Sequence, residues 1–258
     1  MNVTSKIELN EDGFGTFNPE VIAMLLNSIR DFFASVGVES MKPIVIVHDP
    51  TGPECCAIPN EEKHLIKLST GGDFWCQWVY QFAHEYCHHL IDGGLVRQTA
   101  GLRWLEESIC HVASYVCLDN FARICAQRVD LCGNVKQIVD YLEGMMCESG
   151  KILYEPYIHN IQKLNPIVPI PNECYISLHT YIQEKRNKLE SEYFVCGYIY
   201  ISRALFPHFY NNKNLWKILP ELKDTRQWGS VEELYEHLEH HVKDDYRQSL
   251  NDMIGCLI

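Results

Sequence analysis

Two histidines one helical turn apart place the strongest constraint on what this chain can fold into. They begin and end the segment His84-Glu85-Tyr86-Cys87-His88, in a stretch without Gly or Pro that runs from residue 73 to Gly93-Gly94. Such a stretch predicts a single helix that stops at the two glycines. Because positions i and i+4 share one face of a helix, the two imidazoles point side by side. This face can bind one metal ion if the fold brings a further ligand to it.

The residue between the histidines suggests what such an ion would do. Neutral imidazole is a good Zn²⁺ ligand, and a catalytic zinc site leaves one coordination position to water. Glu85 is expected to lean toward that water, where its carboxylate can accept a proton and later deliver it to a leaving group. A metzincin would need Gly three residues after His88 and His or Asp six residues after it. Those positions hold Ile91 and Gly94, so that subclass is excluded.

A candidate third ligand lies on a second predicted helix, over residues 102–127, with Thr99 as its N-terminal cap. This helix carries Trp104-Leu105-Glu106-Glu107-Ser108, and eighteen residues separate His88 from Glu107. Here the chain resembles the gluzincins, specifically the aminopeptidase-like branch, in which HExxH is followed at the same separation by the Glu of a Trp-Leu-x-Glu-Gly motif. Glu107 matches that ligand, Glu106 takes the variable position, and Ser108 stands where the family has Gly. The resemblance covers about residues 63–118.

The resemblance implies an α+β, zincin-like fold, in which a small mixed sheet with an edge strand lies over the active-site helix and a mostly helical lobe follows. It also implies a zinc-dependent metallopeptidase of the gluzincin type. One Zn²⁺ ion would be held by His84, His88 and Glu107, and Glu85 would be the general base that acts on a zinc-activated water. The expected substrate is a peptide or a protein.

The family also supplies an oxyanion donor from a Tyr-x-x-Gly segment at the start of a later helix. The corresponding place here is residues 192–198, but alignment on Gly197 puts Phe194 where the tyrosine should be. Tyr193 is the first candidate, with Tyr198 and Tyr200 as alternatives. The family's Gly-Ala-Met-Glu-Asn strand, which recognises a free amino terminus, is absent from this sequence. Exopeptidase specificity is therefore not carried over.

The remaining pattern predicts an α/β part followed by helices. Apolar spacing predicts a helix over 18–36, and β-branched residues predict a strand over 43–48. Residues 64–69 alternate as in a short edge strand, whose main chain could bind an extended peptide. Later helices are expected at 135–147, 175–206 and 231–242, with a proline-rich connector at 166–171. We expect one compact unit of two lobes, 1–128 with the catalytic motifs and 129–258 completing the cleft.

Further polar residues lie close to the predicted ligands along the helices. Asp92 and His111, each four residues after a ligand, are candidates for contact with a neighbour on the helix face, against plain surface or core roles. His89 is expected on the helix flank, with lining of the substrate cleft as the alternative. Near the C-terminus a histidine group stands among acidic residues, which favours a solvated face over capture of metal from solution: His237, His240 and His241.

Charge and composition narrow the partners. The chain has 22 Lys and Arg against 34 Asp and Glu, a net charge of -12, which disfavours binding to nucleic acid or anionic membranes. No signal-peptide core precedes residue 20, and the most apolar stretch, 194–206, is too short to span a bilayer, so we expect a cytoplasmic protein. The twelve cysteines contain no CxxC pair and are expected as reduced, mostly buried thiols.

Two other functions fit the same residues. The fold could serve as a catalytically silent binding or regulatory module, which the one-residue offset of Tyr193 from the position of the family's tyrosine favours. The same zinc, base and water could also hydrolyse an amide that is not a protein. A through-running groove beside an edge strand would favour peptides, and a closed pocket would favour a small substrate.

Overall fold

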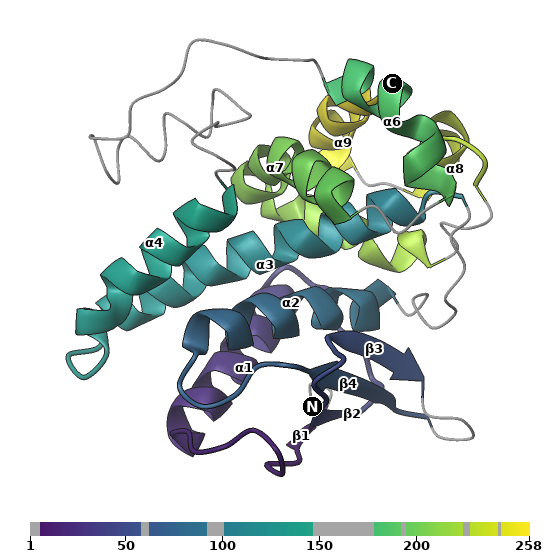
Figure 1. Ribbon diagram of the computed structural model, residues 1–258. Helices are drawn as coiled ribbons and strands as arrows, with labels where there is room; N and C mark the ends of the chain where they lie inside the picture. Colours follow the sequence, from purple (N-terminus) through teal and green to yellow (C-terminus); the bar gives the residue numbers. More distant parts are fainter. Residues whose placement is uncertain are drawn as a thin grey trace.

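The protein has a four-stranded mixed sheet near its N-terminus, followed by a mostly helical region (Figure 1). The computed structural model describes residues 6–57, 62–91, 101–146, 178–191, 195–223, 228–241 and 244–258. The strand order is β1 (Ile7–Leu9), β2 (Ile44–His48), β4 (His64–Leu68) and β3 (Glu54–Ala57). The first three strands run parallel, and β3 is antiparallel to β4. The expected α+β class is confirmed at this level.

The strands predicted at 43–48 and 64–69 are present as β2 and β4, but the edge position expected for β4 is wrong. β4 lies between β2 and β3, with Ile66 opposite Ile46 on one side and Cys55 on the other. The edge strand on this side of the sheet is β3, a four-residue segment with no alternating pattern that its sequence could reveal, and β1 forms the other edge. Side chains of Ile46 and Ile66 are fully buried on one face, which the helices cover.

Two helices pack in the layer next to this sheet. α1 (Pro19–Ser35) confirms the helix expected at 18–36, and the Asn18 side chain caps its N-terminus. α2 (Trp75–Ile91) confirms the helix that carries the histidines, and it packs against β4 and β3. Phe33 of α1 contacts Tyr86 of α2, with ring centroids 5.8 Å apart. The histidine helix is therefore held between the sheet and the rest of the molecule.

The long helix α3 (Arg103–Ala126) crosses over α2 and is covered on its other side by α7 (Val195–Asn211) and α4 (Val135–Met146) (Figure 1). The prediction over 102–127 is thus confirmed, although the cap position is Leu102, which makes no side-chain hydrogen bond. Thr99 lies outside the described residues. Since α3 is buried on nearly all sides, its polar side chains must find partners inside the protein.

The single helix expected at 175–206 is wrong. Two helices, α6 (Leu178–Ser191) and α7, take its place. Tyr181 of α6 stacks on Tyr200 of α7 with ring centroids 3.8 Å apart, whereas a single straight helix would separate these two positions by about 28 Å. The helix expected at 231–242 is present as α8 (Val231–His241). Three helical elements were not predicted: η1 (Cys132–Asn134), the 3₁₀ helix η2 (Lys213–Leu222) and α9 (Asp244–Leu257).

Several expected features lie outside the described residues: Asp92, Tyr193 and the connector at 166–171. Ten of the twelve cysteines lie among the described residues, and all ten are free thiols. Seven of these ten are buried or partly buried in the sheet, α2 and α3. Across the described ranges, no helix combines the length and the apolar character needed to cross a membrane.

Candidate metal centre

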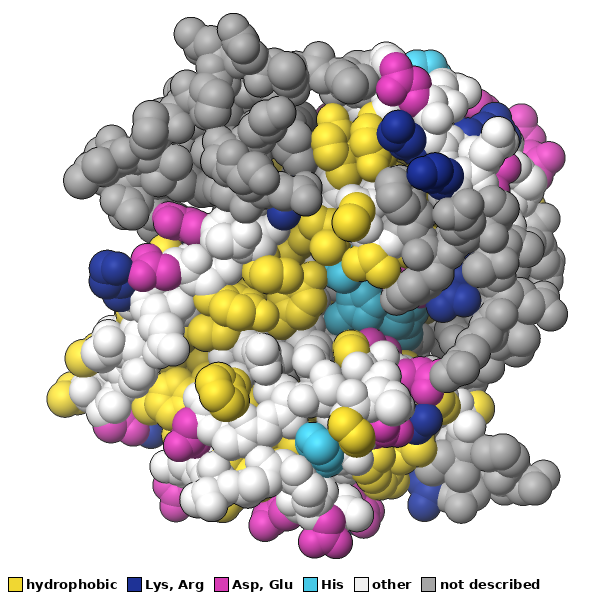
Figure 2. Space-filling view, viewed as in Figure 1, with side chains coloured by type: hydrophobic (Ala, Val, Ile, Leu, Met, Phe, Trp, Pro, Cys, Tyr) yellow, Lys and Arg dark blue, Asp and Glu magenta, His cyan; other side chains and the backbone are white. Residues whose placement is uncertain are grey.

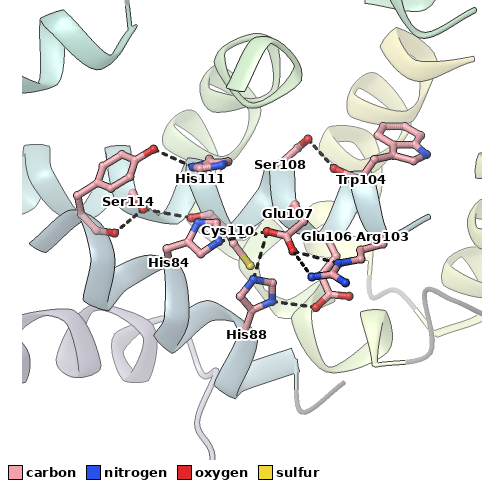
Figure 3. A network of polar contacts seen from close by, with 11 residues as sticks. His84, His88, Arg103, Trp104, Glu106, Glu107, Ser108, Cys110, His111 and Ser114 are labelled. Carbon is pink, nitrogen blue, oxygen red and sulfur yellow. Dashed lines mark hydrogen bonds and ion pairs between the residues drawn. The ribbon is translucent and has the colours of Figure 1, made fainter. Parts of the chain in front are cut away.

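The crossing of α2 and α3 brings the three predicted ligands together (Figure 3). His84 and His88 project from one face of α2, and Glu107 comes from the first turns of α3. One ligand atom from each residue lies within 4.8 Å of the others. The Glu107 Oε2 atom is 3.3 Å from Nε2 of His84 and 3.5 Å from Nε2 of His88. All three side chains are nearly buried, with 7, 9 and 2% of His84, His88 and Glu107 exposed.

These distances fit a tetrahedral zinc site. Zn²⁺ bound at about 2.0–2.1 Å from each ligand sets neighbouring ligand atoms about 3.3–3.4 Å apart. The separations of 3.3 and 3.5 Å around Glu107 Oε2 match the edges of such a tetrahedron. They are longer than a charge-assisted N–H···O bond, which is about 2.7–2.9 Å. Geometry and donor set therefore both fit Zn²⁺.

Two further residues of α3 orient the ligands. Nδ1 of His88 donates to Glu106 Oε1 at 2.9 Å, so that in the neutral imidazole, the form that binds a metal, the lone pair of Nε2 would face Glu107. Arg103 donates to Glu107 Oε1 through Nε at 3.2 Å and Nη2 at 3.0 Å, so that Oε2 is turned toward the histidines. The sequence prediction gave no role to Glu106 or Arg103. The spacing of Arg103 four residues before Glu107 was the available signal, since such pairs meet on one helix face.

His84 has a different environment. Its Nδ1 atom is buried and has no hydrogen-bond partner among the described residues. The ring of His111 lies beside it, with centroids 4.5 Å apart, and Nδ1 of His111 is 2.8 Å from the hydroxyl of Tyr80 on α2. His111 thus contacts His84 and Tyr80 of α2, whereas the sequence predicted a contact with a neighbour on the face of its own helix. Tyr80, one turn before His84, was missed.

The charges of the cluster favour a cation. Burial penalises the Glu107 carboxylate, but the charge of His88 and the hydrogen bonds of both histidines outweigh this and hold the pKa of Glu107 well below its usual range. Burial likewise penalises charge on His88, yet Glu107 and Glu106 raise its pKa well above the usual value. Positive charge close to these buried carboxylates is therefore stabilising, and either protons on the imidazoles or a metal ion can supply it.

Glu85 lies between this cluster and the sheet. It is 4% exposed, and burial raises its pKa, while the charges of His84 and His88 and a hydrogen bond from the backbone N–H of Cys55 act in the opposite direction. Cys55 belongs to the edge strand β3. The carboxylate therefore stands next to both the histidines and the edge of the sheet.

The other predicted site residues make packing contacts and hydrogen bonds within the protein. His89 is fully buried, with Nδ1 2.9 Å from Nδ1 of His64 on β4, so it does not line a cleft. Tyr200 stacks on Tyr181 of α6 at 3.8 Å, and Tyr198 is 2% exposed. Ser108 stands in place of the family's Gly. Its hydroxyl donates a hydrogen bond to the Trp104 carbonyl at 2.6 Å, so this added polar group is paired inside the core.

Figure 2 shows histidine side chains at the floor of a hollow near the middle of one face, where α2 and α3 lie in Figure 1. Hydrophobic side chains gather along one side of this hollow. Histidine side chains of this region thus reach the surface in a depression.

No protein family, no curated protein and no solved structure matches this chain.

Proposed function

We propose that this protein is a zinc-dependent metallopeptidase with a zincin-like, gluzincin-type centre. The observation that carries the proposal is the convergence of His84, His88 and Glu107 at the spacing of a tetrahedral metal site, with Glu85 beside them. Zn²⁺ held there would polarise the substrate carbonyl and make water a stronger acid. Access of a substrate to this centre is supported by the hollow with histidine side chains that Figure 2 shows where α2 and α3 lie.

Glu85 is the residue that moves the proton. Its carboxylate accepts a proton from the attacking water and delivers it to the departing amine. Burial raises its pKa, which makes the protonated state easier to reach between the two transfers. Arg103 and Glu106 act through the ligands, by fixing the rotamers of Glu107 and His88.

The substrate strand is expected to pair with β3 rather than β4. β3 is the last strand on its side of the sheet, and its backbone reaches Glu85 through Cys55. An extended peptide added along this edge would form main-chain hydrogen bonds, and its carbonyl groups would run past the general base.

The test compares the parent protein with Glu85→Gln, using Glu20→Gln on an exposed turn of α1 as the matched control. Zinc content is measured on the purified proteins, and each is incubated with a peptide library. We expect Glu85→Gln to keep its zinc and to lose about 10²–10⁴-fold in turnover, since it loses only proton transfer. Glu20→Gln should match the parent, and Glu107→Ala should lose the metal.

Two results would count against the proposal. Full hydrolysis by Glu85→Gln would remove the mechanism. A zinc-loaded parent that cleaves no peptide would instead favour the silent binding module or a hydrolase that acts on a non-protein amide.

A further inference from the structure

A second group of metal-ligating side chains lies in the C-terminal part of the chain. Glu221 on η2 stands beside His237 and His241 on α8, and one ligand atom of each lies within 4.8 Å of the others. This group shares no residue or element with the centre on α2 and α3. From the sequence, the histidines were interpreted as part of a solvated face. Glu221 lies sixteen residues before His237, so no local spacing indicated that it joins them.

The two histidines are arranged as a chelating pair. They are four residues apart on α8, so both rings leave the same face, with centroids 4.4 Å apart and planes 35° from parallel. Nδ1 of His241 is 2.8 Å from the backbone carbonyl of His237. Because a carbonyl only accepts, this nitrogen carries the proton and Nε2 of His241 keeps its lone pair for a ligand.

The third side chain comes from a different element. Glu221 Oε2 is 3.6 Å from Nε2 of His237, close to the ligand–ligand separation of about 3.3–3.4 Å in a tetrahedral zinc site. The His237 and Glu221 side chains are 28 and 36% exposed, and His241 is exposed, so an ion from solution can reach them and keep water as its other ligands. The ring of Trp228 packs at 4.9 Å from His237 and limits the positions that His237 can take.

We propose that Glu221, His237 and His241 form a second Zn²⁺ site that links η2 to α8. Two imidazoles and one carboxylate are a ligand set that suits zinc. The net charge of -12 favours the approach of a cation. Because the ligands come from two elements, the bound ion fixes the position of α8 on η2. Zinc binding at this site therefore adds to the free energy of unfolding, beyond the contribution of zinc at the first centre.

The test is a titration of the metal-free 258-residue chain with Zn²⁺ alone, followed by calorimetry and by metal analysis after gel filtration. The parent should bind two ions per chain, and His237→Ala should bind one. Since His237 also packs on Trp228, Glu221→Gln serves as a second variant that leaves this packing intact, and it too should lose one ion. His240→Ala is the matched control, because His240 is an exposed histidine of α8 outside the group, and it should keep two.

The first centre is separated from this result by Glu107→Ala, which should keep the ion at Glu221, His237 and His241. A parent that binds only one ion, which Glu107→Ala abolishes, would overturn the second site. So would the loss of an ion from His240→Ala to the same extent as from His237→Ala, because binding would then depend on histidine content and not on this group.

Discussion

Glu106 determines how His88 is presented to the proposed metal. Its carboxylate is 2% exposed and accepts the Nδ1 proton of His88 at 2.9 Å, which fixes the tautomer and the ring orientation. We expect Glu106→Ala to weaken zinc binding at this centre by about 10–100-fold, as loss of such an orienting partner does in other metal sites. Competition with a chelator of known affinity measures the change.

Glu20→Ala on α1 is the control for this variant. The zinc affinity of Glu106→Gln is expected to lie between those of Glu20→Ala and Glu106→Ala, because an amide oxygen still accepts a hydrogen bond from Nδ1 of His88. Zinc affinity in Glu106→Ala equal to that of the parent would mean that the packing of α2 alone orients His88.

At the scale of single residues, spacing could predict which side chains meet but not which ones support them. His84, His88 and Glu107 follow from helix periodicity and one characteristic separation. Glu106 was assigned no role because adjacent positions on a helix do not share a face. It reaches His88 because α3 crosses α2 at an angle that only the packing of the two helices sets.

At the scale of elements, α7 holds the end of α4 through one buried cation. Arg203 is 6% exposed and donates to the Met145 carbonyl through Nε at 3.0 Å and Nη2 at 2.6 Å. Carbonyls in the last turn of a helix have no partner within the helix, so the guanidinium replaces the solvent that burial removes. The two helices are thereby joined across 58 positions of sequence.

We expect Arg203→Met to lower the free energy of unfolding by about 1.5–3 kcal/mol, the contribution of a hydrogen bond to a charged group. Urea unfolding followed by circular dichroism measures this. Arg186→Met on the exposed face of α6, which removes an i,i+4 pair with Glu190, should change stability by less than about 0.5 kcal/mol. Equal losses in the two variants would show that the Met145 carbonyl does not need the guanidinium.

The elements found from sequence are those whose pattern is local. α1, α2 and α3 have long apolar or unbroken stretches, and they begin and end within two residues of the expected limits. β1 and β3 are three and four residues long and exist because β2 and β4 pair with them. The separation of α6 from α7 likewise depends on contacts between residues distant in sequence, such as the stacking of Tyr181 on Tyr200. Such non-local causes leave no periodic signal.

At the scale of the whole molecule, an aromatic cluster joins the N-terminal and C-terminal parts of the chain. Trp216 of η2 is fully buried, and its ring lies 6.1 Å from Phe32 and 5.2 Å from Phe33 of α1, and 4.5 Å from Phe209 of α7. α2, which carries the histidines, also packs against η2. We propose from this that 1–128 and 129–258 form one cooperative unit, in which the C-terminal part supports the helices that carry the proposed metal ligands.

Trp216→Ala tests this unity, because it removes the ring that both parts share. We expect a loss of about 3–5 kcal/mol in the free energy of unfolding, the usual cost of truncating a buried Trp. Helical circular dichroism and release of zinc from the α2–α3 centre should shift together to lower urea and keep one midpoint. Phe74→Ala, at a position 68% exposed, should shift neither. If helical signal is lost in two steps and zinc stays bound through the first, the parts fold separately, and the supporting role of η2 is wrong.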